Sequence, residues 1–580
     1  MSSKPPRMDS GLRREIFVVI ALTLVGAVLR LWSPGRLGLV HFDEGIYALA
    51  GLWVFSPGGL RDFDPTSVAY APPGFSVLAG LCYLGLGVGD FSAILVSIVA
   101  GTLTIPAAAW VARRTFGSGA GAVAAAFAAL SGPHVAFSRM ALTDASFLLF
   151  WVLAIGQGQR FLERPNPTRA VWLGLAVGVA QLFKYNGWIS GVIVALSAAL
   201  WLIVHPRERR SMSTIATWGW GFGAALVAAI VYWPWFQFVE SHGGYRALLA
   251  HQRSYLSGIG SWPAHLSIQL DQQEFLSGGP AWLAGAGFAA ALGMLIAQGD
   301  FRIERRFLPR ILVEVVSLTL MGVWLHPNFG WWCVLVWISF IIIWRMRFAT
   351  KSMWLLGVGW AFLAVLTPFY HAYARLWLPI QAFIWLFMGG LFTSIRSTCE
   401  VRGRGAGWGW NLSSDPLPQL ALICVAGVVF QAESPGSPWK TRRMGLLEPS
   451  DSLRLACRSI QSELPKDVRE LRLFARPPLA FYLALAGGVD GPRQPDLAHL
   501  LEQGASTSWA LLDMAMIRQS HVAAKELDPM LSHWVVVRDI PTTLNLPTLL
   551  DIDPSAASGR SIDAMAGLRL LRPRRIGEVR

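Results

Sequence analysis

The sequence predicts an α-helical polytopic membrane protein with a small C-terminal α/β domain, and three observations support this fold class. Of the 580 residues, 54% are hydrophobic and only 14% are charged, whereas soluble domains carry about 25% charged residues. Apolar runs long enough to cross a bilayer recur from Ile16 to the region of Phe430. Beyond Phe430 the composition changes to a mixture of polar and apolar residues.

The placement of the basic residues indicates a membrane topology. Lys and Arg outnumber Asp and Glu by 49 to 35, a net charge of +14, which could serve either a nucleic-acid surface or a membrane orientation. They lie in short clusters beside apolar segments, as cytoplasmic loops do, so we expect no nucleic-acid partner. The clusters are Arg13-Arg14, Arg113-Arg114, Arg160–Arg169, Arg207–Arg210, Arg302–Arg310, Arg345–Lys351 and Arg396–Arg404.

An alternating path through the membrane accounts for every cluster when the N-terminus is cytoplasmic. The first apolar run follows Arg13-Arg14 but has no small-residue cleavage site, so it is interpreted as a retained helix. About 13 spans of roughly 20 residues then place all the clusters on the inner side. They are expected near residues 15–33, 91–112, 119–137, 144–160, 170–186, 187–204, 213–236, 278–298, 311–326, 331–344, 352–370, 375–395 and 416–432.

This path divides the chain into three parts. Residues 1–14 form a cytoplasmic tail, residues 15–432 a transmembrane domain, and residues 433–580 a periplasmic α/β domain with strand-like stretches at Leu471–Ala475 and Trp534–Val537. The outer loops 33–90 and 237–279 are long enough to carry a site. A short apolar stretch in the first of them, Phe75–Leu86, is expected to re-enter the membrane or to lie along its surface.

The first outer loop begins with an acidic pair. Asp43 and Glu44 lie in His41-Phe-Asp-Glu-Gly-Ile-Tyr47, shortly after the first span. A solvated loop or a helix N-cap would explain these carboxylates, because a helical run follows Asp43. Catalysis at the membrane surface is the other interpretation.

Two further motifs belong to the same outer surface. Tyr70-Ala-Pro-Pro-Gly74 fixes the chain where it returns to the membrane, which a structural turn would also explain. Asp144, in Ser138-Arg-Met-Ala-Leu-Thr-Asp144, begins an apolar run and could likewise be an N-cap. Because acidic residues at a bilayer boundary are often functional, Asp144 joins Asp43 and Glu44 as a candidate catalytic residue.

A few cations stand outside the cytoplasmic pattern. Lys184 interrupts an apolar stretch at its outer turn, Arg375 lies in Tyr370-His-Ala-Tyr-Ala-Arg-Leu-Trp-Leu-Pro379, and Arg139 precedes Asp144. With Tyr70 they are candidates for binding the phosphate of a lipid-linked donor. For Lys184, snorkelling of its long side chain is an equally good explanation.

The second long loop carries two histidines, His242 and His251. They could bind a divalent metal together with an acid from the first loop, although outer loops often contain histidine without such a role. Apart from this metal we expect no cofactor. The five cysteines show neither paired spacing nor a CxxC motif, so no disulfide framework or zinc site is predicted.

The order of these motifs resembles one enzyme family. In chain order these are an acidic pair after the first span, Tyr-x-Pro-Pro, Arg139-x-x-x-x-Asp144, Lys184 at the end of the fifth span and Tyr373-x-Arg375-x-x-x-Pro379. This order is similar to that of the type C glycosyltransferases of family 39, which include protein O-mannosyltransferases and bacterial lipid A aminoarabinose transferases. The resemblance covers residues 15–395.

The resemblance implies the GT-C fold, with residues 15–432 as the catalytic domain, and a hexosyl- or pentosyltransferase of the inner membrane. A sugar would pass from a polyprenyl-phosphate donor to a lipid, glycan or protein acceptor on the periplasmic side, among membrane lipids. Asp43 matches the family's catalytic acid. The chemistry agrees, because a phosphate leaves as a stable anion and one carboxylate base suffices, with cations or a metal on the phosphate.

One departure leaves other readings open. Many aminoarabinose-transferase-like members have Glu-Lys where this chain has Tyr70-Ala71, so their metal-binding acid and phosphate-binding lysine are absent there. A transporter or lipid flippase is the alternative function, but such proteins usually contain repeated halves, and this sequence shows no internal repeat. A scaffold that has lost activity is a third reading.

Overall fold

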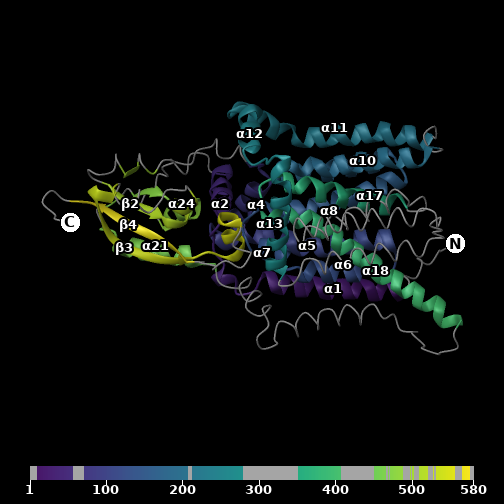
Figure 1. Ribbon diagram of the computed structural model, residues 1–580, viewed down its shortest axis with the longest axis horizontal. Coiled ribbons are helices and arrows are strands. Elements are labelled where there is room, and N and C mark those ends of the chain that lie inside the picture. Colours follow the sequence, from purple (N-terminus) through teal and green to yellow (C-terminus); the bar gives the residue numbers. More distant parts are fainter. Residues whose placement is uncertain are drawn as a thin grey trace. The chain divides into compact units, whose positions relative to one another are not determined.

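The computed structural model describes residues 10–55, 71–206, 212–277, 350–405, 450–465, 471–486, 508–519, 531–554 and 565–574, with single residues between the last segments. The chain forms two compact units (Figure 1). The first comprises Met1–Arg30, Val99–Val135 and Asp144–Met444. The second comprises Leu31–Ile98, Ala136–Thr143 and Gly445–Arg580. Each unit is described by itself.

Long apolar helices confirm the polytopic fold. In the described part of the chain, six helices are long and apolar enough to cross a membrane: Gly11–Arg36, Asp90–Phe116, Thr143–Glu163, Tyr185–Val204, Thr214–Ser241 and Lys351–Phe369. Their outward side chains are apolar, as Phe17 with 73% and Phe222 with 75% exposure show. Such surfaces fit a lipid environment, in which the backbone groups must be satisfied within the helix.

Helices occupy all the predicted spans that fall on described residues. They are α1 (Ser10–Arg30), α5 (Asp90–Phe116), α6 (Ala120–Leu130) with α7 (Gly132–Ser138), α8 (Thr143–Glu163), α9 (Pro167–Phe183), α10 (Ile189–Val204), α11 (Met212–Ser241), α17 (Lys351–Leu366) and α18 (Leu378–Gly405). The predicted spans 278–298, 311–326, 331–344 and 416–432 lie outside the described residues.

One predicted span is broken rather than straight. The helix expected at 119–137 consists of α6 and α7, which are bent by 60° at Ser131. Pro133 explains the break, since it has no amide hydrogen to donate to the preceding turn and its ring clashes with the carbonyl group four residues earlier.

Small residues allow close helix packing in the first unit. Gly174 and Gly178 form a Gly-x-x-x-Gly face on α9, and α11 packs against it. A Cβ added at Gly174 would lie 2.4 Å from the Ala224 carbonyl oxygen, and one at Gly178 would lie 2.8 Å from Val231 Cβ. This close approach is the arrangement that such faces make in membrane helix pairs.

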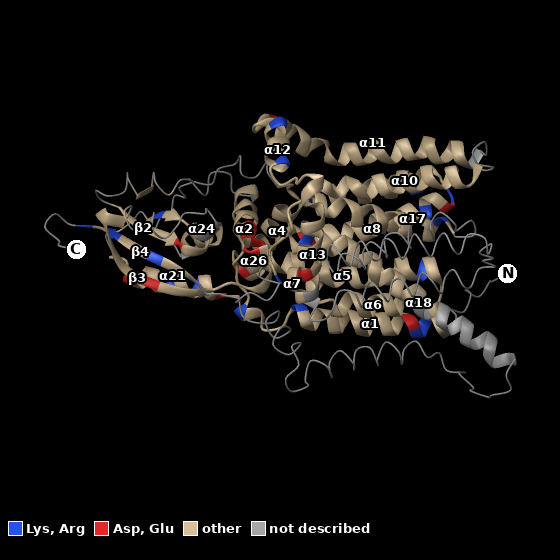
Figure 2. Ribbon diagram, viewed as in Figure 1, with Lys and Arg blue, Asp and Glu red and all other residues tan. Residues whose placement is uncertain are grey.

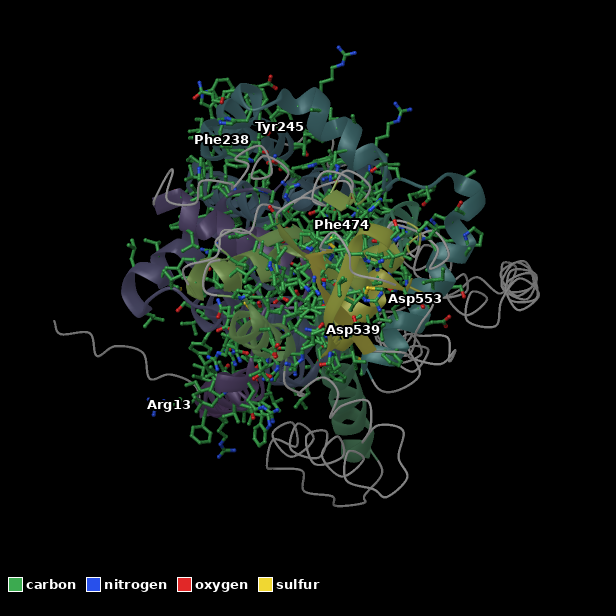
Figure 3. The ribbon with its side chains drawn as sticks, turned by 90° about the vertical axis from the view of Figure 1, so that its left-hand side faces the viewer. Arg13, Phe238, Tyr245, Phe474, Asp539 and Asp553 are labelled. Carbon is green, nitrogen blue, oxygen red and sulfur yellow. The ribbon has the colours of Figure 1, made fainter. Side chains whose placement is uncertain are left out.

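A four-stranded sheet confirms the predicted C-terminal α/β region (Figure 1). Its strands are β1 (Leu471–Phe474), β2 (Trp509–Asp513), β3 (Trp534–Thr543) and β4 (Met565–Pro573), in the order β1-β2-β4-β3. β1 and β2 are parallel, and the other pairs are antiparallel. Phe474, labelled in Figure 3, packs with Trp534 and Leu571 in the core, and Asp539 lies on β3.

The second unit also contains two helices of the first outer loop. α2 (Phe42–Phe55) packs against α4 (Gly74–Leu86), where Tyr83 donates a hydrogen bond to the Ala48 carbonyl oxygen at 3.2 Å. α2 also contacts α22 (Pro477–Ala486) so closely that a Cβ on Gly45 would lie 2.2 Å from Pro478 N. The predicted domain boundary, between 432 and 433, lies outside the described residues.

Candidate active site

The acidic pair lies in a capping box at the start of α2. His41 is the residue before the helix, and its Nδ1 accepts the Asp43 amide at 3.0 Å. Glu44, three residues after His41, accepts the His41 amide through Oε2 at 2.8 Å. This pattern resembles the capping box of Ser-x-x-Glu, with histidine in place of serine and with its hydrogen bond made to the second amide of the helix rather than the third. Asp43 is therefore not the N-cap, and its side chain is half-buried in the first helical turn.

Both oxygens of Glu44 are occupied by backbone amides. Oε2 also accepts the Val40 amide, and Oε1 accepts the Ala141 amide, each at 2.8 Å. The side chain is fully buried. Burial raises the pKa of Glu44, while the amide hydrogen bonds and His41 oppose this rise. These contacts join the start of α2 and the residues before it to the backbone at Ala141, so Glu44 supports the acidic turn.

The second nitrogen of His41 binds an acid from the C-terminal region. His41 Nε2 lies 2.8 Å from Asp551 Oδ2, and both side chains are buried. Asp551 is on α26 (Leu546–Ile552), and Figure 2 shows the acidic residues of α2 and α26. Because Nδ1 accepts a hydrogen bond from the Asp43 amide, the proton of the neutral ring is on Nε2 and is donated to Asp551.

Arg139 also belongs to this second unit. Its Nη1 donates to the Trp32 carbonyl oxygen at 2.8 Å, and the side chain is 4% exposed. Burial lowers the pKa of Arg139 to about 10, which leaves the guanidinium charged at neutral pH.

The first unit contains a second cluster, made of one carboxylate and two cations. Asp144, in the first turn of α8, is buried, and its Oδ1 lies 2.5 Å from Lys184 Nζ. Its Oδ2 lies 4.0 Å from Arg375 Nη1 and accepts no hydrogen bond within the described part of the chain. Two cationic side chains therefore lie at the same carboxylate.

Helix ends and short turns present the two cations. Lys184 is the C-cap of α9, and its Nζ lies 5.8 Å from the centre of the Phe147 ring. Arg375 lies in the short turn Ala374–Trp377, and its guanidinium carbon lies 5.0 Å from the centre of the Tyr373 ring. Contacts of this kind orient a cation over an aromatic face.

Glutamines of α13 (Trp262–Ser277) hold the turn that carries Arg375. Gln272 Nε2 donates to the Ala372 carbonyl oxygen at 2.8 Å, and Gln273 Nε2 donates to that of Ala374 at 2.9 Å. Both glutamines are buried. They fix the backbone on either side of Tyr373, so the position of Arg375 depends on α13.

The predicted metal ligands lie near the end of α11 and on α12 (Gly244–Arg253). His242 Nδ1 is 2.9 Å from the Phe238 carbonyl oxygen, and His251 packs edge-on to Tyr255. Where residues are described, no three His, Cys, Asp or Glu side chains come together to hold a metal ion. The described residues therefore do not make a complete metal site around either histidine.

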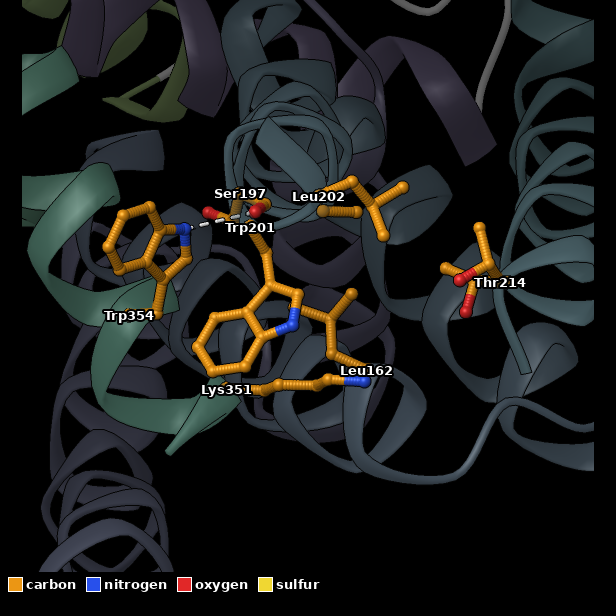
Figure 4. Close-up of a pocket in the computed structure, with 9 residues that line it drawn as sticks. Leu162, Ser197, Trp201, Leu202, Thr214, Lys351 and Trp354 are labelled. Carbon is orange, nitrogen blue, oxygen red and sulfur yellow. Dashed lines mark hydrogen bonds between the residues drawn. The ribbon is translucent and has the colours of Figure 1, made fainter. Parts of the chain in front are cut away.

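A small pocket lies among helices of the first unit (Figure 4). Trp201, Trp354, Lys351 and Thr214 are among its lining residues, and Trp354 Nε1 donates to the Ser197 carbonyl oxygen at 3.0 Å. Of the predicted site residues that the structure describes, none lines this cavity. The charged cluster around Asp144 is therefore a stronger candidate for the active site than this pocket.

The predicted residues thus fall into groups. Asp144, Lys184 and Arg375 come together in the first unit. Asp43, Glu44 and Arg139 belong to the second unit. Tyr70 lies outside the described residues.

Comparison with known proteins supports the predicted resemblance. Residues 70–235 match the family described as dolichyl-phosphate-mannose-protein mannosyltransferase. The chain is similar to ArnT from Cupriavidus metallidurans bound to undecaprenyl phosphate, with a TM-score of 0.51, 15% identity, and coverage of 96% of this chain and 97% of that one. The fold is that of the type C glycosyltransferases. The resemblance predicted from the motif order is thereby confirmed.

A second GT-C structure, the Archaeoglobus fulgidus oligosaccharyltransferase in complex with Zn and sulfate, has a TM-score of 0.50 and 13% identity. The similarity covers 89% of this chain and 71% of that one. No curated protein sequence matches the chain.

His41 is next to the acidic pair in the sequence, but its role as the N-cap of α2 was not predicted. The spacing His41-x-x-Glu44 is the available signal, because Glu three residues after an N-cap marks a capping box. No signal in the sequence identifies Asp551 as its partner.

Proposed function

We propose that this GT-C protein is a glycosyltransferase that moves a hexosyl or pentosyl group from a polyprenyl-phosphate donor to a hydroxyl group of a lipid, glycan or protein. The observation that carries the proposal is the cluster in which the buried Asp144 meets Lys184 and approaches Arg375. An isolated charge is costly in a low-dielectric region, and the two cations of this cluster are the groups that an anionic ligand would bind.

The cluster fits the phosphate of the donor. A sugar phosphodiester carries one negative charge, and lysine and arginine side chains bind such groups through charge-assisted hydrogen bonds. Lys184 and Arg375 would bind the phosphate and stabilise the charge that grows on its oxygens as the sugar departs. Asp144 orients both cations, and its Oδ2 can accept a hydrogen bond from a sugar hydroxyl. The undecaprenyl phosphate bound to the structurally similar ArnT supports this class of donor.

Asp43 is the proposed general base. Its half-buried carboxylate lies in the first turn of α2, where the helix dipole favours the ionised form. It would take the proton of the acceptor hydroxyl as the oxygen attacks the anomeric carbon and the bond from that carbon to the phosphate oxygen breaks. The polyprenyl phosphate leaves as an anion, so no general acid is needed.

The remaining predicted residues have supporting roles in this proposal. Glu44 holds the turn of the base through its three amide hydrogen bonds. Arg139 and Tyr70 stay candidates for donor contacts, and His242 and His251 stay candidates for a divalent metal. The sulfate and Zn named for the oligosaccharyltransferase agree with an anion site and a metal in this fold. No step described above passes through a metal.

The proposed orientation has the N-terminus in the cytoplasm and the C-terminal domain in the periplasm, in an inner membrane. The clustering of Lys and Arg between the spans supports it. A periplasm-dependent reporter fused after Phe430 is expected to be active. If that reporter is inactive and one fused after Arg302 is active, the protein has the opposite orientation in the membrane.

Two measurements test the proposed activity. Mass spectrometry of lipids, glycans and glycoproteins from cells with and without the protein should reveal an acceptor that loses one hexose or pentose. The purified protein in liposomes should transfer a labelled sugar from an undecaprenyl-phosphate donor to that acceptor. A change in the distribution of a lipid across the bilayer, with no transfer of sugar, would instead support a flippase.

A further inference from the structure

The segment that leads into α2 is bound along its length by C-terminal residues. Ser450 Oγ accepts the Gly38 amide at 3.0 Å, and Tyr482 Oη accepts the Leu39 amide at 2.7 Å. Arg476 Nη1 donates to the Val40 carbonyl oxygen at 2.9 Å, and Arg454 Nη2 donates to that of Gly35 at 2.7 Å. The backbone before the acidic turn therefore takes its conformation from residues more than 400 positions later in the chain.

The side chains that bind this segment are themselves fixed by charged partners. Arg476 forms a buried ion pair with Asp513, with Nε 2.6 Å from Oδ2. Tyr482 donates a hydrogen bond to Asp90 Oδ2 at 3.1 Å, and Arg454 lies 2.8 Å from the same oxygen. Buried polar contacts of this kind specify one arrangement, because an unpaired alternative is costly.

The last contact in this series reaches Asp43. Asp551 binds His41 Nε2, which leaves Nδ1 to accept the Asp43 amide. An N-cap is usually an oxygen atom that accepts hydrogen bonds in every state of its side chain. Imidazole can do so only when the facing nitrogen carries no proton. The carboxylate of Asp551 selects that tautomer and orients the ring, as carboxylate partners of histidine do in metal and catalytic sites.

We propose that the C-terminal α/β region is a positioning element of the transferase, in which Asp551, acting through His41, sets the position of Asp43. This inference rests on the proposed function, since it assumes that Asp43 is the base. His41 and Asp551 are positioning residues that need not contact the substrate. The region contributes to catalysis because it holds the turn from which the base acts.

A double-mutant cycle tests this dependence. The full-length protein is reconstituted in liposomes with the labelled undecaprenyl-phosphate sugar that the wild type uses. We expect Asp551→Ala to lower kcat by about 10- to 100-fold, the loss that a displacement of about 1 Å can cause. KM for the donor should change less than about threefold, because Lys184 and Arg375 are untouched.

The His41→Asn variant separates a loss of positioning of Asp43 from a general loss of stability. Its side-chain oxygen can accept the Asp43 amide without any help from an acid, since Asn is a favoured N-cap. Asp551→Ala should therefore have little further effect on kcat in the His41→Asn background. An equal loss of kcat in both backgrounds would overturn the proposal, because Asp551 would then act independently of His41.

A matched control lies on β3 of the same C-terminal region. Asp539→Ala removes an exposed ion pair with Arg569, in which Oδ1 lies 2.7 Å from Nε, and it should leave kcat unchanged. If Asp551→Ala does not fold, His41→Ala and His41→Asn give the same test, with kcat higher for Asn because only Asn restores the cap. Equal kcat values for these two variants would contradict the inference.

Asp43→Asn in the same assay distinguishes the positioning role from the proposed base. Loss of transfer in Asp43→Asn with wild-type kcat in Asp551→Ala refutes the positioning role and keeps the base. Wild-type transfer by Asp43→Asn refutes the base itself.

Discussion

Lys184 Nζ lies 2.5 Å from Asp144 Oδ1, so that an ion pair joins the end of α9 to the first turn of α8. Lys184 is 40 residues from Asp144, and its side chain is 22% exposed while that of Asp144 is 2% exposed. The exposed side of the cation can bind a ligand without separation of the pair. A lysine that only snorkels toward a lipid surface would not need a buried acid beside it.

Lys184→Ala should weaken the binding of undecaprenyl phosphate about tenfold or more, the loss of one charge-assisted contact of about 1.5–3 kcal/mol. Titration of the purified protein with undecaprenyl phosphate in detergent measures this affinity. Lys184→Arg keeps the charge and should lose less. Equal affinities for wild type and Lys184→Ala would contradict a phosphate role for the lysine.

Glu44→Gln and Asp43→Asn should behave differently. Gln keeps one acceptor oxygen, but its NH₂ group cannot accept, so it loses at least one of the hydrogen bonds that Glu44 now receives from Val40, His41 and Ala141. The loss of buried acceptors costs about 1–3 kcal/mol each, so Glu44→Gln should lower the melting temperature. Asp43→Asn should leave it nearly unchanged, because that side chain is half-buried. Thermal unfolding of both variants checks this, and equal melting temperatures would count against the supporting role of Glu44.

Gly45→Ala should destabilise the second unit, because its new Cβ would lie 2.2 Å from Pro478 N and the neighbour is backbone. Overpacking of this kind costs about 1–3 kcal/mol or more. Gly85→Ala on α4 is the matched control, with no atom within 4 Å of its Cβ, and should be neutral or slightly stabilising. A melting temperature unchanged by Gly45→Ala would show that α2 and α22 are not packed this closely.

Cys457 should resist alkylation in the folded protein. Burial raises the pKa of this thiol to about 12. The folded pKa is above the usual value near 8.5, so the thiol stays protonated between pH 7 and 9. Raising the pH across this interval should barely increase its rate of reaction with iodoacetamide, whereas the unfolded protein should react much faster. Mass spectrometry of labelled peptides measures both rates, and equal rates would contradict the burial of Cys457.

Much of the fold follows from patterns that are local in the sequence. Apolar length and the sorting of basic residues predicted the spanning helices α1, α5, α6, α8, α9, α10, α11, α17 and α18, but not α12 and α13, which lie in a predicted outer loop. The bend at Ser131 was missed because Pro133 lies within an apolar run, so composition alone did not mark the break.

The site was predicted in part for the same reason. Because the predicted spans alternate in direction, Asp144, Lys184 and Arg375 are expected on the same side of the membrane. This placement needs only the topology. His41 and Asp551 are 510 residues apart, and their pairing depends on how the C-terminal region folds. Asp551 lies in a short helix with no distinguishing motif, so no local pattern could reveal it.

The most direct test of the central claim is sugar transfer by Asp43→Asn in liposomes, with the donor and acceptor of the wild type. Proton abstraction by a positioned base is worth about 10²–10⁴-fold in rate. If Asp43 is the base, kcat should fall by this factor, with a wild-type melting temperature and wild-type affinity for undecaprenyl phosphate. Transfer by Asp43→Asn at the wild-type rate would contradict it.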